Sequence, residues 1–177
     1  MRRGFPRRAG RRAERLALLN NANQMMQAGD YKGAAAAFDQ LAAAAERRSG
    51  RRAPMFLLQA GRSRVLSGGV AEGLPLLKRG LGLLSARGRW LGFQRAGQRI
   101  ASELQGRGLA AESKEIEALL AQSLPAGTPI PAAGTRHPVL PTHCPACGAV
   151  VHPDEIEWLD GMTGECDYCG SPLRAQG

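Results

Sequence analysis

The sequence has few aromatic residues and no long apolar run. Phe, Trp and Tyr make up 5% of the 177 residues, which favours helices packed through small side chains over a β-sandwich. No apolar run approaches the roughly 20 residues that a membrane-spanning helix requires, and no apolar stretch follows the basic N-terminus as it would in a secretory signal peptide. We therefore expect a mainly α, cytoplasmic protein without a membrane span.

Motifs of the common catalytic sites are also missing. The sequence has no phosphate-binding Gly-rich loop with Lys-Ser/Thr, no His-Glu-x-x-His and no Gly-x-Ser-x-Gly. The three histidines lie in or beside the cysteine-containing C-terminal segment. Glu112, Glu115 and Glu117 are close in sequence but lack a partner acid or a ligand set, so we interpret them as a solvated helix face. We predict that the protein is not an enzyme.

All four cysteines of the chain form two Cys-x-x-Cys pairs near the C-terminus. The four residues are Cys144, Cys147, Cys166 and Cys169. Two intervening residues let a tight turn aim both thiolates of a pair at one ion. Gly148 and Gly170 follow the two pairs and supply the positive φ that such a turn often needs. The spacing predicts one tetrahedral, structural site for a single Zn²⁺ ion.

Other uses of the cysteines need different surroundings. Disulfides require an oxidising compartment, and a redox Cys-x-x-Cys starts a helix after a strand. Iron, in an iron–sulfur or rubredoxin-like site, is the alternative that uses the same four thiolates. A catalytic zinc keeps an open coordination position, which four thiolates do not leave. We interpret His143 and His152 as neighbours of the site rather than ligands.

The two Cys-x-x-Cys-Gly knuckles resemble a zinc ribbon, a hairpin-based module found in many unrelated interaction proteins. Between the knuckles, residues 155–159 alternate acidic and apolar side chains as a half-buried strand does, and residues 160–164 form a turn. The resemblance implies a small β-hairpin module over residues 143–177. These 35 residues bury too little apolar surface to fold alone, so the metal must supply most of the folding free energy.

Residues 13–124 have the periodicity of helical hairpins. Apolar stripes predict helices that begin near residues 14, 31, 53, 70, 90 and 109, with Gly-containing breaks inside each pair. The apolar residues that follow these breaks are Tyr31, Val70 and Leu109, and they recur at a spacing of 39 residues. A fixed period in this range indicates stacked helix–turn–helix units.

The first hairpin is similar to a tetratricopeptide repeat, through Gly29-Asp30-Tyr31 followed by Ala34, Phe38 and Leu41. The resemblance implies antiparallel hairpins stacked as a short solenoid of about six helices, with a concave groove for a partner. Trp90 and Phe93 are either core residues or the side chains that face a peptide in this groove.

Charge is divided unevenly along the chain. Residues 1–135 contain 22 Lys and Arg against 9 Asp and Glu, a net charge of +13, whereas residues 136–177 contain 2 against 6, a net charge of −4. Residues 1–12 lack apolar periodicity and predict a disordered basic arm. Its arginines form either a solvated tail or a contact for nucleic acid, an anionic membrane or an acidic protein. They are Arg2, Arg3, Arg7, Arg8, Arg11 and Arg12.

Residues 125–142 contain five prolines and two glycines, which predicts an extended linker. The chain thus divides into an arm (1–12), a helical repeat domain (13–124), the linker (125–142) and a zinc ribbon (143–177). We expect a non-catalytic scaffold or adaptor for a protein partner. The alternative is a nucleic-acid-associated zinc-ribbon protein that uses its basic arm and body. In either case the acidic module could dock on the basic body and mask it.

Overall fold

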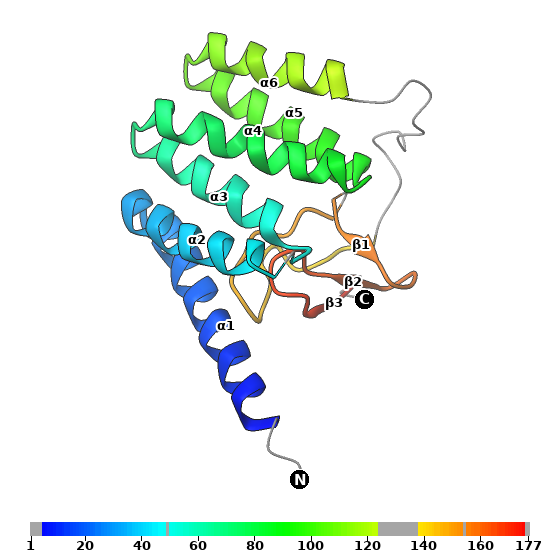
Figure 1. Ribbon diagram of the computed structural model, residues 1–177. Coiled ribbons are helices and arrows are strands. Elements are labelled where there is room, and N and C mark those ends of the chain that lie inside the picture. Colours follow the sequence, from blue (N-terminus) through cyan, green and yellow to red (C-terminus); the bar gives the residue numbers. More distant parts are fainter. Residues whose placement is uncertain (1–4, 49, 124–137, 154, 176–177) are drawn as a thin grey trace.

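Six helices and a small sheet make up the computed structural model, which describes residues 5–48, 50–123, 138–153 and 155–175. The helices pack as three successive antiparallel hairpins, each against the next (Figure 1). We call residues 5–123 the helical block and residues 138–175 the C-terminal module. The helices are α1 (Phe5–Ala28), α2 (Tyr31–Glu46), α3 (Ala53–Leu66), α4 (Val70–Ala86), α5 (Trp90–Gly106) and α6 (Ala110–Ser123).

The turns after α1, α3, α4 and α5 are built alike. Each contains a glycine at positive φ, and the residue after that glycine donates its N–H to a carbonyl five residues earlier, inside the helix that ends there. Left-handed φ is accessible to glycine at little cost, and the hydrogen bond satisfies a carbonyl that the end of the helix leaves free. The glycines are Gly29, Gly68, Gly88 and Gly108. The predicted breaks within the three hairpins are therefore confirmed.

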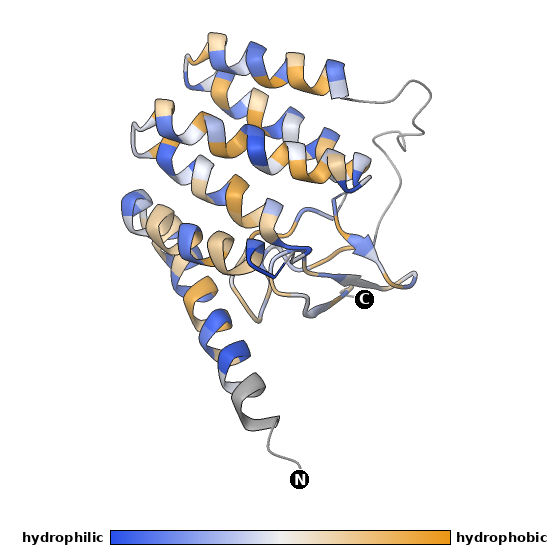
Figure 2. Cartoon of the chain, in the orientation of Figure 1, coloured by the Kyte–Doolittle hydropathy of each residue, from blue (hydrophilic) through white to orange (hydrophobic). Residues whose placement is uncertain are grey.

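The first helix begins earlier than the sequence predicts. In place of the disordered arm expected over residues 1–12, α1 begins at Phe5, and residues 1–4 lie outside the described part of the chain. The side chains of residues 10–15 are exposed, and Figure 2 shows hydrophilic residues along this part of α1. A helix already formed by the packed residues that follow extends without a new nucleation cost. Ala and Arg also favour helix, so no apolar stripe is needed here.

The second hairpin has the closest helix–helix contact. Gly61 of α3 faces Gly73 of α4, and a Cβ on Gly61 would lie 2.8 Å from the Gly73 carbonyl oxygen. Farther along, a Cβ on Gly80 would lie 3.0 Å from the Pro54 carbonyl oxygen. These glycines allow the two backbones to approach, and large side chains fill the space on either side.

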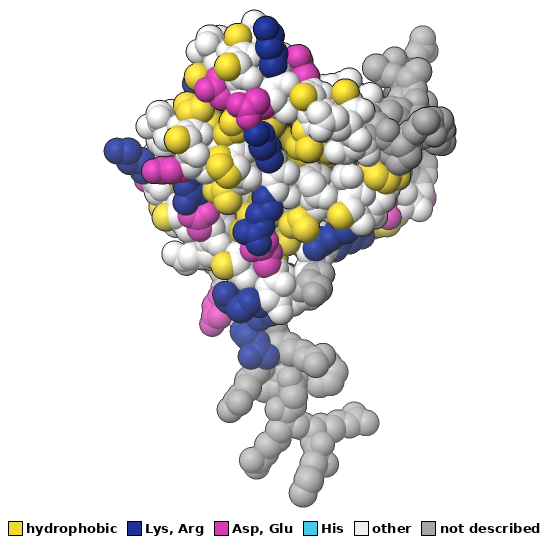
Figure 3. Space-filling model, turned by 45° about the horizontal axis from the view of Figure 1, so that its top comes forward, with side chains coloured by type: hydrophobic (Ala, Val, Ile, Leu, Met, Phe, Trp, Pro, Cys, Tyr) yellow, Lys and Arg dark blue, Asp and Glu magenta, His cyan; other side chains and the backbone are white. Residues whose placement is uncertain are grey.

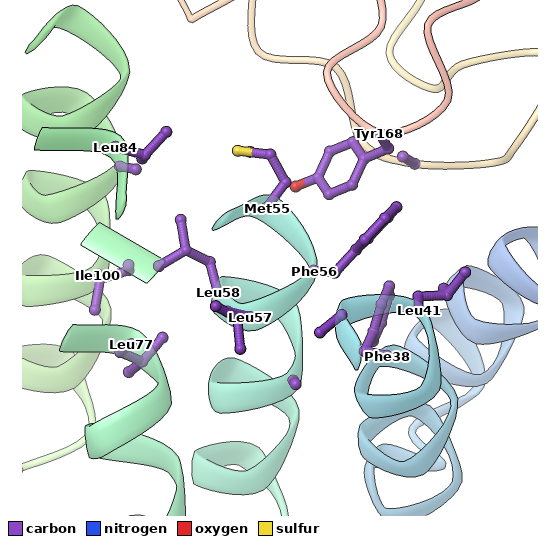
Figure 4. Packing of buried hydrophobic residues seen from close by; sticks show 14 of the residues in the cluster. Phe38, Leu41, Met55, Phe56, Leu57, Leu58, Leu77, Leu84, Ile100 and Tyr168 are labelled. Atoms are coloured by element: carbon purple, nitrogen blue, oxygen red, sulfur yellow. The ribbon is translucent and has the colours of Figure 1, made fainter. Parts of the chain in front are cut away.

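Three phenylalanines anchor the core of the helical block. Phe38 of α2, Phe56 of α3 and Phe93 of α5 are all fully buried. Leucines of α3 and α4 pack around them, and Figure 4 shows Leu57, Leu58 and Leu77 in this layer. The core thus runs through all three hairpins. None of the described helices has the length and apolar character to cross a membrane.

The C-terminal module holds a three-stranded antiparallel sheet in the order β1-β2-β3, formed by β1 (Glu157–Trp158), β2 (Thr163–Glu165) and β3 (Pro172–Arg174). The predicted hairpin corresponds to β1 and β2, with Trp158 opposite Gly164. The third strand was not predicted, and it pairs Leu173 with Gly164 on the other edge of β2. Outside the sheet, Val150 forms an isolated bridge with His143.

The C-terminal module packs directly on the helical block. Figure 1 shows the module next to the start of α3, and the buried residues of both parts form one continuous cluster. Leu140, which the sequence assigns to the linker, is 5% exposed and belongs to this cluster. Residues 125–137 of the predicted linker lie outside the described residues. The docking that the sequence left open is therefore present.

Candidate metal centre

The four cysteine sulfurs come together as the sequence predicts. All lie within 4.8 Å of one another. The sulfurs of Cys144 and Cys169 are 3.7 Å apart, and those of Cys147 and Cys166 are 3.8 Å apart. A tetrahedron with metal–sulfur bonds of about 2.3 Å has sulfur–sulfur edges of about 3.8 Å, whereas a disulfide needs about 2.05 Å. The arrangement therefore fits a four-thiolate metal site and not a pair of disulfides.

The two knuckles have the same backbone geometry. Gly148 N–H donates to the Cys144 carbonyl and Gly170 N–H to the Cys166 carbonyl, each over 2.8 Å. Both glycines have positive φ, 70° at Gly148 and 76° at Gly170. A second hydrogen bond closes each turn, from the first cysteine N–H to the carbonyl five residues later. Two matching turns thus present two thiols each to one point.

Hydrogen bonds among the four cysteine side chains lower the pKa of two of them and raise the pKa of the other two. Hydrogen bonds from the Cys147 and Cys166 thiols lower the pKa of Cys144 to about 6. A hydrogen bond with Cys144 lowers the pKa of Cys169 and raises the pKa of Cys147 and of Cys166. Ser171 N–H, 3.4 Å from the Cys169 sulfur, further favours its thiolate. A divalent cation between the sulfurs would favour the thiolate form of all four.

The second knuckle is anchored by the two residues between its cysteines. Asp167 pairs with Arg89, the residue before α5, over 2.8 Å. The Asp167 side chain is only 12% exposed, and this burial raises its pKa against the opposing effect of Arg89. Tyr168 is buried beside Met55 and Phe56 (Figure 4), and burial raises its pKa to about 12.

The Tyr168 hydroxyl is not left unsatisfied in this apolar setting. It accepts a hydrogen bond from Gln59 of α3, with Nε2 and oxygen 2.6 Å apart. A buried hydroxyl without a partner would cost about 1–3 kcal/mol. The hydrogen bond from Gln59 therefore allows the Tyr168 ring to be buried, and the buried ring anchors the second knuckle.

The first knuckle is held through its backbone. Asn23 of α1 donates from Nδ2 to the Cys147 carbonyl over 2.8 Å, and Gln27 donates to the Gly148 carbonyl over 3.4 Å. Asn23 is 7% exposed, so its amide would be costly to bury without this acceptor. Both knuckles are thus fixed by side chains of the helical block.

Charge complementarity adds to these contacts. Five ion pairs among the described residues join the module to the helical block, and in every one the arginine belongs to the block and the acid to the module. They are Arg51–Glu157, Arg51–Glu165, Arg52–Glu165, Arg89–Asp167 and Arg99–Glu155. The net positive charge of the block and the net negative charge of the module therefore attract each other across this contact.

Arg52 lies against the second knuckle. Its guanidinium pairs with Glu165 over 2.8 Å and lies against Gly170, where a Cβ would overlap it. Its Nε is buried without a hydrogen-bond partner. Gly170 therefore meets two requirements, a left-handed turn and room for this arginine.

A pocket of about 150 Å³ lies between the module and the helical block. Asn23, Gln59 and Tyr168 line it together with two arginines. Those arginines are already paired, Arg62 with Glu103 and Arg99 with Glu155. The pocket walls are thus formed by the docking contacts themselves.

The other residues singled out from the sequence lie elsewhere. His143 is exposed beside Thr142, and His152 is half-buried at the pocket. Arg11 and Arg12 are exposed on α1. Arg7 and Arg8 belong to α1 without described side chains, and Arg2 and Arg3 lie outside the described residues.

Phe93 is a core residue, fully buried. It therefore cannot face a peptide groove, which was one of the two roles considered for it. Trp90 is half-buried and packs edge-to-face on Phe93, with ring centroids 6.4 Å apart. Glu115, on the glutamate-rich helix face, pairs with Lys78.

The helix residues that anchor the knuckles were not predicted, although each is a polar residue at an apolar position of the sequence pattern. Asn23 interrupts the apolar stripe of its helix, and Gln59 interrupts the apolar run of residues 53–60. A polar residue at a core position requires a partner, and the module supplies both. Comparisons of the chain with protein-family models, with curated proteins and with solved structures gave no match.

Proposed function

We propose that the protein is a non-catalytic adaptor in which a zinc ribbon, built around one structural Zn²⁺ ion, is fixed to a short tetratricopeptide-like stack. The observation that carries this proposal is the four-thiolate site. Cys144, Cys147 and Cys166 are buried and Cys169 is half-buried. Four thiolates fill a tetrahedral shell, so the ion would hold structure rather than activate water or a substrate.

The identity of the ion is tested by metal analysis of the purified protein. We expect one zinc per chain, because four-thiolate tetrahedral sites on paired knuckles suit Zn²⁺. Iron in its place would give visible absorption and would support the rubredoxin-like alternative. Protein with neither metal, and with four freely reactive thiols under reducing conditions, would overturn the proposal.

The partner surface of this adaptor differs from the one that the repeat resemblance implies. The ion pairs and hydrogen bonds of the module fall on α1, α3 and α5 and on the turns before α3 and α5. The module therefore contacts the first helix of each hairpin, and a separate peptide could bind to these positions only by displacing the module.

The tip of the β1–β2 turn offers a different contact. Leu159 and Met162 are 58% and 54% exposed. Asp160 accepts a hydrogen bond from the Met162 N–H over 2.7 Å and so orders the turn between them. Large apolar side chains displayed on an ordered turn suit insertion into an apolar pocket of a protein partner. We propose this tip as the contact of the adaptor.

The partner proposal is tested by affinity capture with nuclease-treated lysate. The wild-type protein is compared with L159S/M162S, and with V139S as a control at another exposed apolar residue, 68% exposed. A protein retained by the wild type and V139S, but lost from L159S/M162S, would support the adaptor. A protein captured from untreated lysate but not from nuclease-treated lysate would instead favour nucleic-acid association.

A further inference from the structure

The basic side chains of the helical block fall into groups with different partners. One group pairs with the module, as described above. A second pairs with acids of the helical block itself, which neutralises it locally. These pairs are Arg62–Glu103, Arg64–Asp39, Lys78–Glu115 and Arg79–Glu46.

A third group gathers at one corner of the molecule. Arg11, Arg12 and Arg15 lie on the exposed part of α1, and Arg47 and Arg48 follow the end of α2. All five are exposed, and within the described residues no acid forms an ion pair with any of them. We call these five residues the arginine corner. Figure 3 shows basic side chains gathered on the lower part of the molecule, where α1 leaves the stack.

The members of the arginine corner repel one another. α1 and α2 form an antiparallel hairpin, so the end of α2, which Arg47 and Arg48 follow, lies beside the earlier part of α1 (Figure 1). Arg11 and Arg15 are also four residues apart on one helix, a spacing at which like charges destabilise the helix. Glu14 lies between Arg12 and Arg15 in the sequence, but five arginines leave the corner with a net positive charge, so a polyanion would bind here with favourable Coulomb energy.

The chemistry of the corner selects among polyanions. Arginine forks bind phosphate oxygens in a bidentate manner. Binding to single strands depends on aromatic rings that stack on bases, and the corner contains none. Insertion into a membrane surface needs exposed apolar side chains. Among the residues whose side chains the structure describes, the large exposed ones lie in the C-terminal module, at Val139, Val150, Leu159 and Met162.

We infer that the arginine corner binds the phosphate backbone of double-helical nucleic acid, without reading base sequence. A straight helix that projects beyond the stack (Figure 1) can lie along a duplex, while Arg47 and Arg48 reach the phosphates beside it. The module forms its ion pairs with other arginines. Cys169 and Ser171 of the module line a small pocket with Arg12 and Arg15, but both arginines remain exposed. The inference is independent of the adaptor proposal, since the two surfaces share no residue.

The test uses full-length, metal-loaded protein and a labelled duplex oligonucleotide, titrated at several salt concentrations. R12Q/R47Q/R48Q removes three charges from the corner. The matched control K32Q/K114Q/R174Q removes three exposed charges from other places. We expect the corner variant to lose about tenfold in affinity and its salt slope to flatten by about 2–3, because each lost phosphate contact removes about 0.9. The control should change less than about twofold.

Several outcomes would overturn the inference. Equal losses in the two variants would mean that only net charge matters. Tighter binding to a single strand than to the duplex would exclude the backbone of a double helix as the ligand. Binding of polyglutamate or anionic vesicles in preference to duplex would assign the corner to an acidic protein or to lipid. Dissociation constants weaker than about 100 μM at physiological salt would fall below the range of sequence-independent backbone binding and would mean that the corner does not bind nucleic acid.

Discussion

The helical block and the C-terminal module reach a folded core by different means. The block fills its interior with three phenylalanines and many leucines, and its helices approach closely at glycines. The module places one buried ring, Tyr168, and a few aliphatic side chains around four cysteines, with Trp158 half-buried beside them. Burial of apolar surface stabilises the block, whereas we propose that the module depends on a metal ion and on contacts with side chains of the block.

The boundary between the two parts differs from both interiors because it is largely polar. Among the described residues it contains five arginine–carboxylate pairs and three hydrogen bonds from amide side chains. Partly buried ion pairs add little net stability compared with apolar residues, but removing one partner is costly. The boundary therefore fixes where the module sits more than it stabilises the protein.

Loss of one metal ligand should have the largest effect. In C147S we expect the module to lose the metal and its free energy of unfolding to fall by about 5 kcal/mol or more. Most helix content should remain, because the block has its own core. Metal analysis, thiol reactivity and far-UV circular dichroism measure these three quantities. A chelator should reproduce the effect in the wild type and added zinc should reverse it. Extensive loss of helix would mean that the block depends on the module.

The Arg89–Asp167 pair should give the next largest effect. R89M leaves a carboxylate that is 12% exposed without its counterion, at an expected cost of about 2–3 kcal/mol. Urea unfolding measures the loss. The double variant R89M/D167N should be more stable than R89M, because it removes the uncompensated charge. If the effects of the two substitutions on the free energy of unfolding are additive, Arg89 and Asp167 do not stabilise the docked module through their interaction.

The glycine contact in the block should respond to a single methyl group. G61A pushes a Cβ to 2.8 Å from the Gly73 carbonyl oxygen, so α3 and α4 must separate, at a cost of about 2 kcal/mol. G82A is the control, because no atom lies within 4 Å of a Cβ there and alanine favours helix. The melting temperature should fall in G61A and stay the same or rise in G82A. Equal changes would show that the two helices are not in close contact at Gly61.

The two knuckle glycines should differ by the smallest amount. G148A and G170A both force alanine into a left-handed turn, at about 1–2 kcal/mol each. G170A also displaces Arg52, whereas a Cβ on Gly148 would meet nothing closer than 3.7 Å. We expect G170A to be less stable by about 1 kcal/mol more, the net worth of one partly buried contact. In an R52A background, this difference should vanish in urea unfolding. If it persists, Arg52 does not pack on the second knuckle.

The sequence alone predicted the parts of the fold that depend on local patterns. Apolar stripes and Gly-containing breaks located the helices, and cysteine spacing located the metal centre. The N-terminal turns of α1 escaped prediction because they extend an existing helix and need no apolar face of their own. The strand β3, three residues long, is too short to show an alternating pattern.

Docking could not be predicted in detail because it joins residues far apart in the sequence. Opposite net charges suggested that module and block attract each other, but not which arginine meets which acid. Asn23 and Gln59 were visible as polar interruptions of apolar helix faces. Their acceptors, the Cys147 carbonyl and the Tyr168 hydroxyl, depend on the three-dimensional placement of the knuckles, which no local pattern encodes.

The docking hydrogen bonds also bear on the order in which the chain folds. Asn23 and Cys147 are 124 residues apart, and Gln59 and Tyr168 are 109 apart, whereas each helical hairpin closes over a short turn. Short-range contacts form faster because less chain entropy is lost before they are made. The hairpins should therefore assemble first and the module should dock last. If unfolding follows the reverse order, the module is released first. Its release would also release the metal and would free α1 from its contacts with the module.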